Sequence, residues 1–235
     1  GEFSEELKVY SGMLKALDRS VGRILDTLEK NNLTDNTLIV LTSDNGGANY
    51  IHLSDINKPY RGWKLTHFEG GLHVPFMAKW PNKIKPGIEF NAPIHANDIL
   101  PTFAAAAGAE LPDDRIIDGV NLLPFLQNHN SEMPHETLYW LQGRLQTVLH
   151  ENWKLITDHR TGKDWLFNVE SDPYERINLA SEMTLKVEEL KRLLNDHKKV
   201  QPPPLYDNTM SAPILIDKHN GYAFQDGDEF TYWDN

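Results

Sequence analysis

Apolar residues near the start of the chain recur at steps of three and four, which is the period of one helical face. Ser4 can cap such a helix, and Glu5 and Glu6 give the acidic first turn that a helix N-terminus favours. The apolar positions are Leu7, Tyr10, Leu14, Leu17, Val21, Ile24, Leu25 and Leu28. We therefore predict a long amphipathic helix in this segment.

The residues from 37 to 42, TLIVLT, are largely apolar and do not alternate with polar ones. Such a run is typical of a strand covered on both faces in a parallel sheet. A shorter strand is predicted around residues 74–79, and a capped helix follows from residue 97 to a glycine stop at Gly108. A helix, a loop and a buried strand in this order indicate an α/β fold.

The pattern changes near residue 130. Four short runs, ETLYWLQ, LQTVLH, WKLITD and DWLFNV, are rich in aromatic and β-branched residues and predict a small antiparallel sheet. A helix is predicted over residues 182–199, with Leu185, Leu190, Leu193 and Leu194 facing inward. Residues 205–235 are rich in aromatic and turn residues, and we expect them to wrap the surface without a core of their own. We divide the chain into residues 1–129, residues 130–200 and a tail, residues 201–235.

Composition narrows the classes of function. The chain has 235 residues, of which 40% are hydrophobic, and a formal net charge of −11. That charge argues against non-specific binding to nucleic acid or anionic lipid, because both depend on a surplus of Lys and Arg. The sequence contains no run of eighteen apolar residues, so it predicts no membrane-spanning helix. The absence of cysteine excludes disulfides, zinc–thiolate sites and thiol nucleophiles.

The predicted strand at residues 37–42 ends in Ser43-Asp44-Asn45-Gly46-Gly47. Ligands gather at the carboxyl ends of strands in open α/β sheets, and carboxylate and amide oxygens suit Ca²⁺ or Mg²⁺. Asp44 and Asn45 are therefore candidate metal ligands. The same four residues, Asp-Asn-Gly-Gly, are also typical of a plain turn, so the pattern is compatible with either a metal site or a turn.

Two cations and several histidines follow this candidate site. Arg61 and Lys64 lie in a glycine-punctuated segment that could present them to an oxyanion, although exposed basic pairs are common. His52 and His67 are the histidines most worth testing as acids or bases. No Gly-x-Ser-x-Gly elbow or phosphate-binding glycine loop is present, so the sequence contains no recognisable nucleophile motif.

Several blocks in order along the chain resemble the sulfatase family. They are TSDNGG, YRGWKLTHFEGGLHVPFMAKWPNKIKPG, DILPTFAAAAGAELP, WKLI and LFNVESDPYERINLA. The resemblance implies an alkaline-phosphatase-like α/β fold, a mostly parallel sheet with helices on both faces, and a smaller C-terminal domain of an antiparallel sheet and a helix. It also implies hydrolysis of sulfate esters by a formylglycine, made from a Cys or Ser, with a bound Ca²⁺.

Matched residue by residue, the resemblance makes Asp44 and Asn45 metal ligands and Lys64 the catalytic lysine that contacts the sulfate. Lys64 and His67 are the predicted substrate-binding residues, although His67 lies where relatives vary. The Glu69-Gly70-Gly71 motif is expected to shape the loop. Ser171 to Arg176 superficially echo the modification signature, but they belong to the LFNVESDPYERINLA block and are rejected as the nucleophile.

The family's N-terminal half, which carries the paired aspartates and the modification signature, has no counterpart in this chain. Two oxygen ligands cannot satisfy a cation that takes six to eight, so we expect the chain alone to be inactive and to need that missing half as a partner. An incomplete sheet would expose an apolar edge that favours association into oligomers. From the habit of relatives, we expect a periplasmic or secreted protein.

Two other functions stay open. A phosphonate or phosphodiester hydrolase of the same superfamily would use similar metal and oxyanion chemistry. A non-catalytic module that binds glycans or proteins is the second alternative, with Trp140, Trp153 and Trp165 as a sugar-stacking platform, although aromatic residues at strand spacing are more often core. For all of these functions the expected ligand is a small molecule or a glycan. If the chain is part of a sulfatase, that ligand is sulfated.

Overall fold

The computed structural model describes residues 4–127 and 132–234, and the chain divides into two compact units. The sheet unit comprises Gly1–Leu7, Ser43–Pro75 and Thr137–Asn235, and the helix unit comprises Lys8–Thr42 and Phe76–Glu136. These units group segments that pack together, whereas the predicted boundaries divide the chain by sequence order. The boundary at residue 129 lies outside the described residues, and the boundary at residue 200 stays a prediction. Within the described ranges, no helix is both long and apolar enough to cross a membrane.

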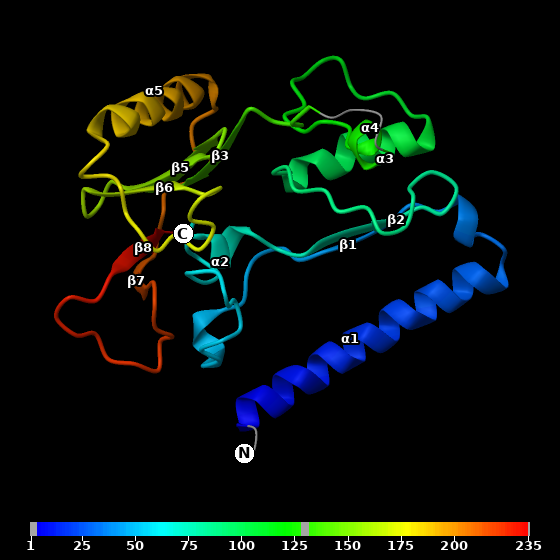
Figure 1. Ribbon diagram of the computed structural model, residues 1–235, viewed down its shortest axis with the longest axis horizontal. Helices are drawn as coiled ribbons and strands as arrows, with labels where there is room; N and C mark the ends of the chain where they lie inside the picture. Colours follow the sequence, from blue (N-terminus) through cyan, green and yellow to red (C-terminus); the bar gives the residue numbers. More distant parts are fainter. Residues whose placement is uncertain (1–3, 128–131, 235) are drawn as a thin grey trace. The chain divides into compact units, whose positions relative to one another are not determined.

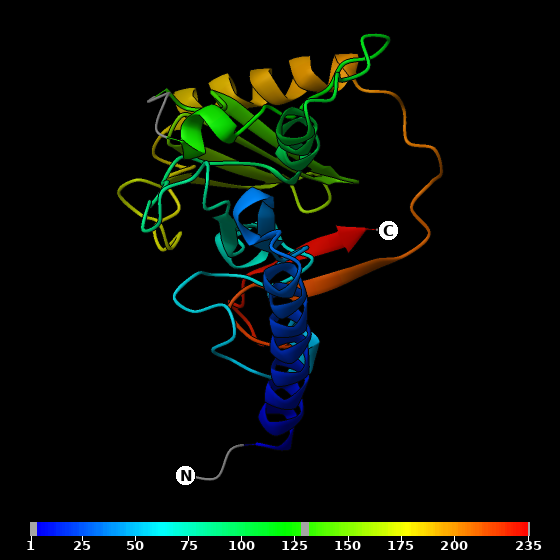
Figure 2. The same cartoon turned by 90° about the vertical axis from the view of Figure 1, so that its right-hand side faces the viewer.

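The sheet unit is built on a four-stranded antiparallel sheet in the order β3-β4-β5-β6, as the four aromatic runs predicted (Figure 1). The strands are β3 Thr137–Gln142, β4 Leu145–His150, β5 Trp153–Asp158 and β6 Lys163–Asn168. The helix α5, Thr184–Val200, lies along one face of this sheet, which Figure 2 shows from the side.

The face of the sheet toward α5 is a continuous apolar layer. Alternate strand positions point to this side because successive side chains of a strand point to opposite faces. The buried residues of the layer are Val148, Leu155, Leu166, Val187, Leu190 and Leu194. The prediction for Leu190 and Leu194 is confirmed, and Leu193 packs against the layer partly buried. The prediction for Leu185 is wrong: it is 86% exposed, because it lies five residues before Leu190 and so about 140° around the helix.

The opposite face of the sheet is also buried. Ile156, Trp165 and Phe167 take the alternate positions and pack with Leu145, with Phe68 from the segment before the sheet, and with Ile216 from the tail. Burying a side chain of this size stabilises the fold by about 1.5–3 kcal/mol. A sheet buried on both faces is therefore the rigid part of the unit, and Phe68 fixes the preceding segment to it.

The C-terminal tail contributes to this core. It forms two antiparallel strands, β7 Ser211–Leu215 and β8 Phe230–Asp234, and Ile216 directly after β7 is fully buried. The expectation that the tail wraps the surface holds only for part of it, since the tail forms two strands and buries Ile214, Leu215 and Ile216 in the sheet unit. The turn-forming residues between the strands had obscured the short apolar run PILI.

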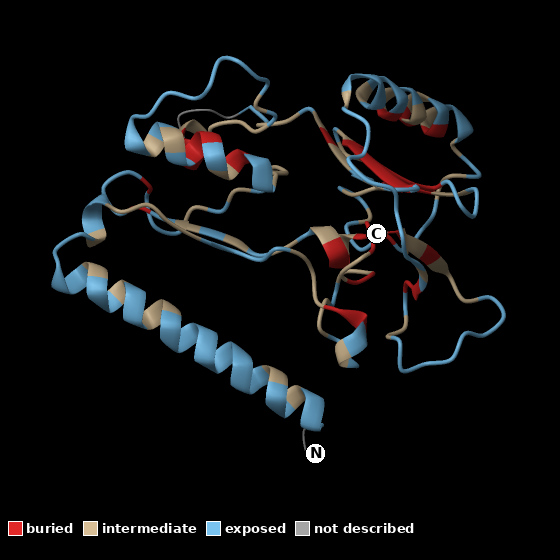
Figure 3. Ribbon diagram, turned by 180° about the vertical axis from the view of Figure 1, so that it is seen from behind, coloured by how far each residue is buried: buried red, intermediate tan, exposed pale blue. Residues whose placement is uncertain are grey.

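Helix α1, Glu5–Lys30, lies in the helix unit from Lys8 onward and confirms the predicted long helix. The Leu7 amide donates to Ser4 Oγ at 3.2 Å, as expected for the cap. Helix α1 has no buried residue, and Figure 3 shows it pale blue and tan along its length. Its apolar stripe is present in the sequence, but in this structure the residues of the stripe are exposed or only half-buried.

The remainder of the helix unit is a short two-stranded sheet with two helices. Strands β1, Ile39–Thr42, and β2, Phe76–Lys79, pair antiparallel. The predicted parallel pairing is therefore not seen among the described strands, and β1 is half exposed instead of covered on both faces. The helices are α3, Ile99–Ala107, ended by Gly108 at φ 68°, and α4, Leu123–Leu126. Trp80, Ile84, Leu122, Leu123 and Leu126 form the core.

Candidate functional site

The residues that directly follow β1 form the acidic loop, residues 43–47, and lie in the sheet unit. This loop is tied to the lysine loop, residues 57–68, and to the short helix α2, Glu69–Leu72, that follows it. The Lys64 amide donates to the Gly47 carbonyl at 3.0 Å, and the Gly46 amide donates to the Gly71 carbonyl at 3.0 Å. The structure thus joins the backbone next to Asp44 and Asn45 to the backbone of Lys64.

The side chain of Asn57 reinforces this junction. Its Oδ1 accepts from the Gly47 amide at 2.7 Å, and its Nδ2 donates to the Gly47 and Gly62 carbonyls at 2.9 and 3.0 Å. A side-chain amide with partners on both loops replaces the hydrogen bonds that a sheet would otherwise supply. The two loops are therefore joined to each other by a polar network, while Phe68 at the end of the lysine loop packs in the core of the sheet unit.

Glycine is required where the acidic loop meets α2. A Cβ built on Gly46 would lie 1.7 Å from the Gly70 carbonyl oxygen, and one built on Gly70 would lie 2.4 Å from the Gly62 carbonyl oxygen. Because these neighbours are backbone atoms, they cannot move aside as a flexible side chain would. The glycines of both Asp-Asn-Gly-Gly and Glu-Gly-Gly thus allow the close approach of the two loops.

Asp44 and Asn45 differ in exposure. Asp44 is exposed, and Asn45 is half-buried with its Nδ2 donating to the Gly46 carbonyl at 2.9 Å. That bond uses one N–H of the amide, and the amide oxygen is a potential acceptor or ligand. An exposed carboxylate beside an amide oxygen fits a hard divalent cation in donor chemistry but supplies only part of a coordination shell. The described residues hold no cluster of three or more His, Cys, Asp or Glu that could bind a metal.

Of the two candidate cations, Arg61 forms ion pairs with carboxylates of this chain. Its guanidinium is 8% exposed, pairs with both oxygens of Asp217 at 2.6 Å and also contacts Glu229, both from the tail. These carboxylates raise the pKa of Arg61 although burial opposes them. Arg61 is therefore a structural ion-pair partner, and the sequence-based suggestion that it faces an oxyanion is wrong. Lys64 is half-buried on the same loop.

His67 is 5% exposed, and its Nδ1 lies 2.9 Å from Thr147 Oγ1 on β4. Burial and the positive charge of Lys154 lower the pKa of His67 to about 3, against a hydrogen bond with the Gln142 side chain that raises it. The imidazole is therefore neutral at physiological pH. A direct contact between His67 and substrate stays a prediction.

A buried charge cluster fixes α2 to the sheet. Lys154 is 1% exposed, and its Nζ lies 2.5 Å from Glu69 Oε1 and 2.9 Å from Glu175 Oε1. Glu175 Oε2 also accepts from the Glu69 amide at 2.6 Å, and Glu69 Oε2 lies 2.9 Å from His73 Nδ1. We call Lys154, Glu69 and Glu175 the buried triad. It links the glycine motif, β5 and the SDPYER segment.

The triad perturbs the acidity of its members. Burial by itself raises the pKa of Glu69, but the charge of Lys154 and the hydrogen bond with His73 outweigh it and lower that pKa to about 2. Burial raises the pKa of Glu175 in spite of the attraction of Lys154. The two carboxylates raise the pKa of Lys154 against the effect of its burial. A charged Lys154 is thus the group that lets both acids stay in the interior.

Two family matches agree with this geometry. Residues 2–109 match the Sulfatase family, and residues 62–200 match the family of N-sulphoglucosamine sulphohydrolase C-terminal domains. The second match covers more than half of the chain. The chain belongs to the sulfatase family.

Relatives of this sulfatase chain include the steryl-sulfatase of Rattus norvegicus, 38% identical over 70% of the chain and 29% of the relative. The ulvan-active sulfatase of Formosa agariphila is 28% identical over 91% of the chain and 48% of the relative. The crystal structure of Ps i-CgsB in complex with k-i-k-neocarrahexaose superposes with a TM-score of 0.75 at 32% identity, covering 87% of the chain and 46% of that protein. The chain therefore spans between about a quarter and a half of the length of these relatives.

The structural likeness confirms the fold class of this sulfatase chain as α/β and alkaline-phosphatase-like. Sequence reasoning missed the triad, although a signal existed. Lys154 lies in the apolar run WKLI, two positions before Ile156 and so on the same face of β5. A lysine at such a position needs a buried carboxylate partner, and Glu69 and Glu175 were available within the resemblance blocks.

The tryptophans do not form a common platform. Trp165 is fully buried in the core of the sheet unit, and Trp153 packs partly buried against the α5 layer on the other face. Trp140 lies on β3 and is half-buried. The proposed three-tryptophan sugar platform is therefore wrong, because the alternation of strand residues sends Trp153 and Trp165 to opposite faces.

Proposed function

We propose that this chain is part of a sulfuric ester hydrolase, with Asp44 and Asn45 as metal ligands and Lys64 against the sulfate. The observation that carries the proposal is the hydrogen bond between the Lys64 amide and the Gly47 carbonyl, which fixes the predicted ligand loop beside the predicted sulfate-binding lysine. Membership in the sulfatase family supports the choice of reaction.

Each residue has a separate role in this proposal. The Asp44 carboxylate and the Asn45 amide oxygen would hold a Ca²⁺ or, alternatively, a Mg²⁺ ion, and such an ion when bound supplies Lewis-acid polarisation of the sulfate oxygens. The Lys64 ammonium stabilises negative charge that develops on the substrate as the ester bond breaks. The buried triad keeps α2 and the adjoining lysine loop in place. His67 is neutral and hydrogen-bonded to Thr147, so it adds no positive charge to the site.

The reaction needs groups beyond these. Two side-chain oxygens leave a calcium shell of six to eight ligands incomplete. The attacking group, which the family resemblance gives as a formylglycine, belongs to the N-terminal half. We therefore propose that activity belongs to the full-length protein, in which the remaining ligands join Asp44 and Asn45.

The test compares aryl sulfate and aryl phosphonate hydrolysis by the full-length protein. The proposal expects a higher kcat/KM for the sulfate, and a loss of roughly a hundredfold or more in Lys64→Ala, as for the removal of one group that stabilises transition-state charge. Lys58→Ala is the matched control, because Lys58 lies on the same loop in an exposed pair with Asp55. Preferential phosphonate cleavage, or unchanged rates in Lys64→Ala, would contradict the proposal.

The phosphonate alternative has structural support at the level of fold. The phosphonate monoester hydrolase of Agrobacterium radiobacter superposes with a TM-score of 0.61 at 24% identity. That likeness concerns the fold alone, and the same metal and oxyanion chemistry would serve either ester. Substrate choice therefore depends on the pocket around the site.

A further inference from the structure

The sheet unit has an aromatic pocket of about 400 Å³, which is within the usual size of small-molecule sites. Its walls come from three places: the turn η2, Asn49–Ile51, the residue after Lys64, and the β7–β8 region of the tail. We call it the tail pocket. The rings that line it are Tyr50, Tyr222, Phe224 and Trp233.

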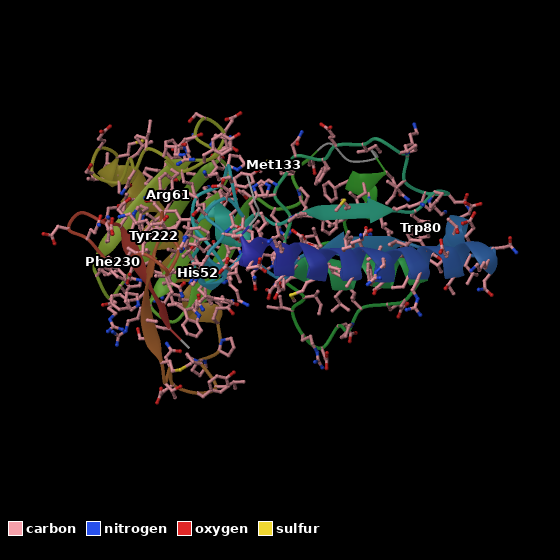
Figure 4. The ribbon with its side chains drawn as sticks, turned by 90° about the horizontal axis from the view of Figure 1, so that it is seen from below. His52, Arg61, Trp80, Met133, Tyr222 and Phe230 are labelled. Atoms are coloured by element: carbon pink, nitrogen blue, oxygen red, sulfur yellow. The ribbon has the colours of Figure 1, made fainter. Side chains whose placement is uncertain are left out.

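The rings of the tail pocket are unusually accessible. Tyr50, Tyr222 and Phe224 are each 51–54% exposed, although a core would normally bury aromatic residues. The ring centroid of His219 lies 4.5 Å from that of Tyr222 and 5.2 Å from that of His52, and Figure 4 labels the last two residues. This row of rings extends the aromatic surface from the tail to the residue that ends η2.

Polar groups accompany the rings. Asn49 and Asn220 both line the pocket, and the Asn220 amide donates to the Asn49 carbonyl at 3.3 Å, which fixes the tail to η2. The lining residues Asn220, Tyr50 and Tyr222 carry polar side-chain groups in addition to the apolar surface of the rings, whereas Asn49 is buried. A sugar ring has both an apolar face for stacking and hydroxyls for such groups.

The backbone beside the pocket is held in an uncommon conformation. Leu65 lines the pocket, follows Lys64 directly and has φ 77°, and His52 at the end of η2 has φ 57°. For a residue other than glycine, such angles are strained and tend to mark functional sites. The strain at Leu65 lies one residue from the lysine that the proposed function places against the sulfate.

Charge also favours a ligand held by stacking. At a net charge of −11, this chain has no general positive field to attract a sulfated polymer. Such a substrate must be held by local contacts: Lys64 for its sulfate and neutral surfaces for the rest. The tail pocket is an aromatic surface of this kind that directly adjoins Leu65.

From this geometry we infer that the tail pocket binds a sugar ring of a sulfated carbohydrate, with Tyr222 and Phe224 as stacking residues. This inference rests on the proposed function, since it assigns the pocket to the carbohydrate part of the same substrate. Tyr222 and Phe224 are then specificity-determining residues, and they act on binding of the sugar without touching the sulfate.

The first test is binding to the full-length protein, measured by calorimetry. The probes are carrageenan, ulvan and heparin oligosaccharides, each in its sulfated and its desulfated form. For the oligosaccharide that binds best, Tyr222→Ala and Phe224→Ala are each expected to weaken binding about tenfold in both forms. Tyr206→Ala is the control, because Tyr206 is an exposed tail tyrosine outside the pocket lining, and it should bind as the wild type does. Thermal unfolding confirms that all three variants are folded.

The second test separates this inference from the proposed function. In Tyr222→Ala, kcat/KM for the sulfated oligosaccharide should fall about tenfold through KM, while that for p-nitrophenyl sulfate stays unchanged. Oligosaccharide binding without hydrolysis of any sulfate ester would refute the proposed function and leave the sugar site standing. Failure of all probes to bind, wild-type binding in both pocket variants, or an equal loss for a steroid sulfate would overturn the sugar site.

Discussion

The two units of the chain use similar apolar patterns with different results. In the sheet unit, both faces of β3–β6 are buried, and alternate residues supply two separate apolar layers. In the helix unit, α1 has a comparable apolar stripe, yet none of its residues is buried, and Leu41 and Met77 of the two-stranded sheet are exposed. A sequence pattern fixes which face of an element is apolar, but the face is covered only if a partner is present.

The largest expected effect is on the buried triad. Lys154→Met removes the cation and leaves two carboxylates in the interior, which should lower the free energy of unfolding by about 3–5 kcal/mol. Urea titration measures this change. Arg115→Met in the helix unit is the control, since its ion pair with Asp114 is exposed and should leave stability near wild type. If Lys154→Met were as stable as the control, the triad would not hold the sheet unit together.

The second prediction compares one leucine from each unit. Leu190→Ala empties a fully buried position under α5 and should cost about 2–5 kcal/mol. Leu17→Ala on α1, where the side chain is 57% exposed, should change stability by less than about 0.5 kcal/mol in the same chain. Equal losses in a urea titration would mean that α1 is covered after all.

The third prediction compares two glycines. Gly46→Ala places a methyl group against the Gly70 carbonyl and should destabilise the protein by about 1–3 kcal/mol, because two backbone segments must separate. Gly12→Ala in α1 has nothing within 4 Å of the new Cβ and should stabilise the helix by about 0.5–1 kcal/mol. Thermal unfolding gives both values. Gain of stability in Gly46→Ala would show that the acidic loop and α2 are not in close contact.

The smallest effect is a dependence on pH. The pKa of His67 is near 3 in the folded chain and about 6.5 when unfolded, so the unfolded state binds more protons between these values. Stability should therefore fall as the pH drops below about 6.5, by up to about 1.4 kcal/mol per pH unit. Glu69 adds a similar loss only below about 4.5. The pKa values of His95, His159 and His219 are also lowered, and that of Glu175 is raised, so the contribution of His67 is obtained by comparison with a variant that lacks this histidine.

His67→Gln provides the control for this pH series, because glutamine does not titrate and can still hydrogen-bond Thr147. The difference in unfolding free energy between wild type and variant should shrink steadily toward low pH. A constant difference across the series would mean that the pKa of His67 is the same in the folded and unfolded states.

The sequence allowed accurate prediction of elements whose signal is local. Helix α1, the four aromatic strands, α5 and the Ser4 cap all follow from period, turn residues and capping within a few positions. Leu185 was misplaced because the four leucines of that helix do not all fall on one face. The pairing of β1 with β2 and the burial of Ile216 depend on segments far apart in the chain, and no local pattern encodes them.

The sequence predicted which residues form the candidate site but not the contacts between them. Asp44, Asn45 and Lys64 came from a strand end, a glycine-rich segment and a family resemblance, and the structure adds the hydrogen bonds that join their loops. Arg61 looked like an equally good oxyanion ligand, because its acidic partners, Asp217 and Glu229, lie more than 150 residues away. Long-range charge pairing therefore decides which cation stays available.

Calcium binding by the full-length protein tests the central claim most directly. Isothermal calorimetry of the wild type and of Asp44→Ala compares the same site with and without its predicted carboxylate ligand. The account predicts a saturable site in the wild type that is lost in Asp44→Ala, while thermal unfolding without calcium stays unchanged because Asp44 is exposed. Equal calcium affinity in both proteins, or no binding in the wild type, would contradict it.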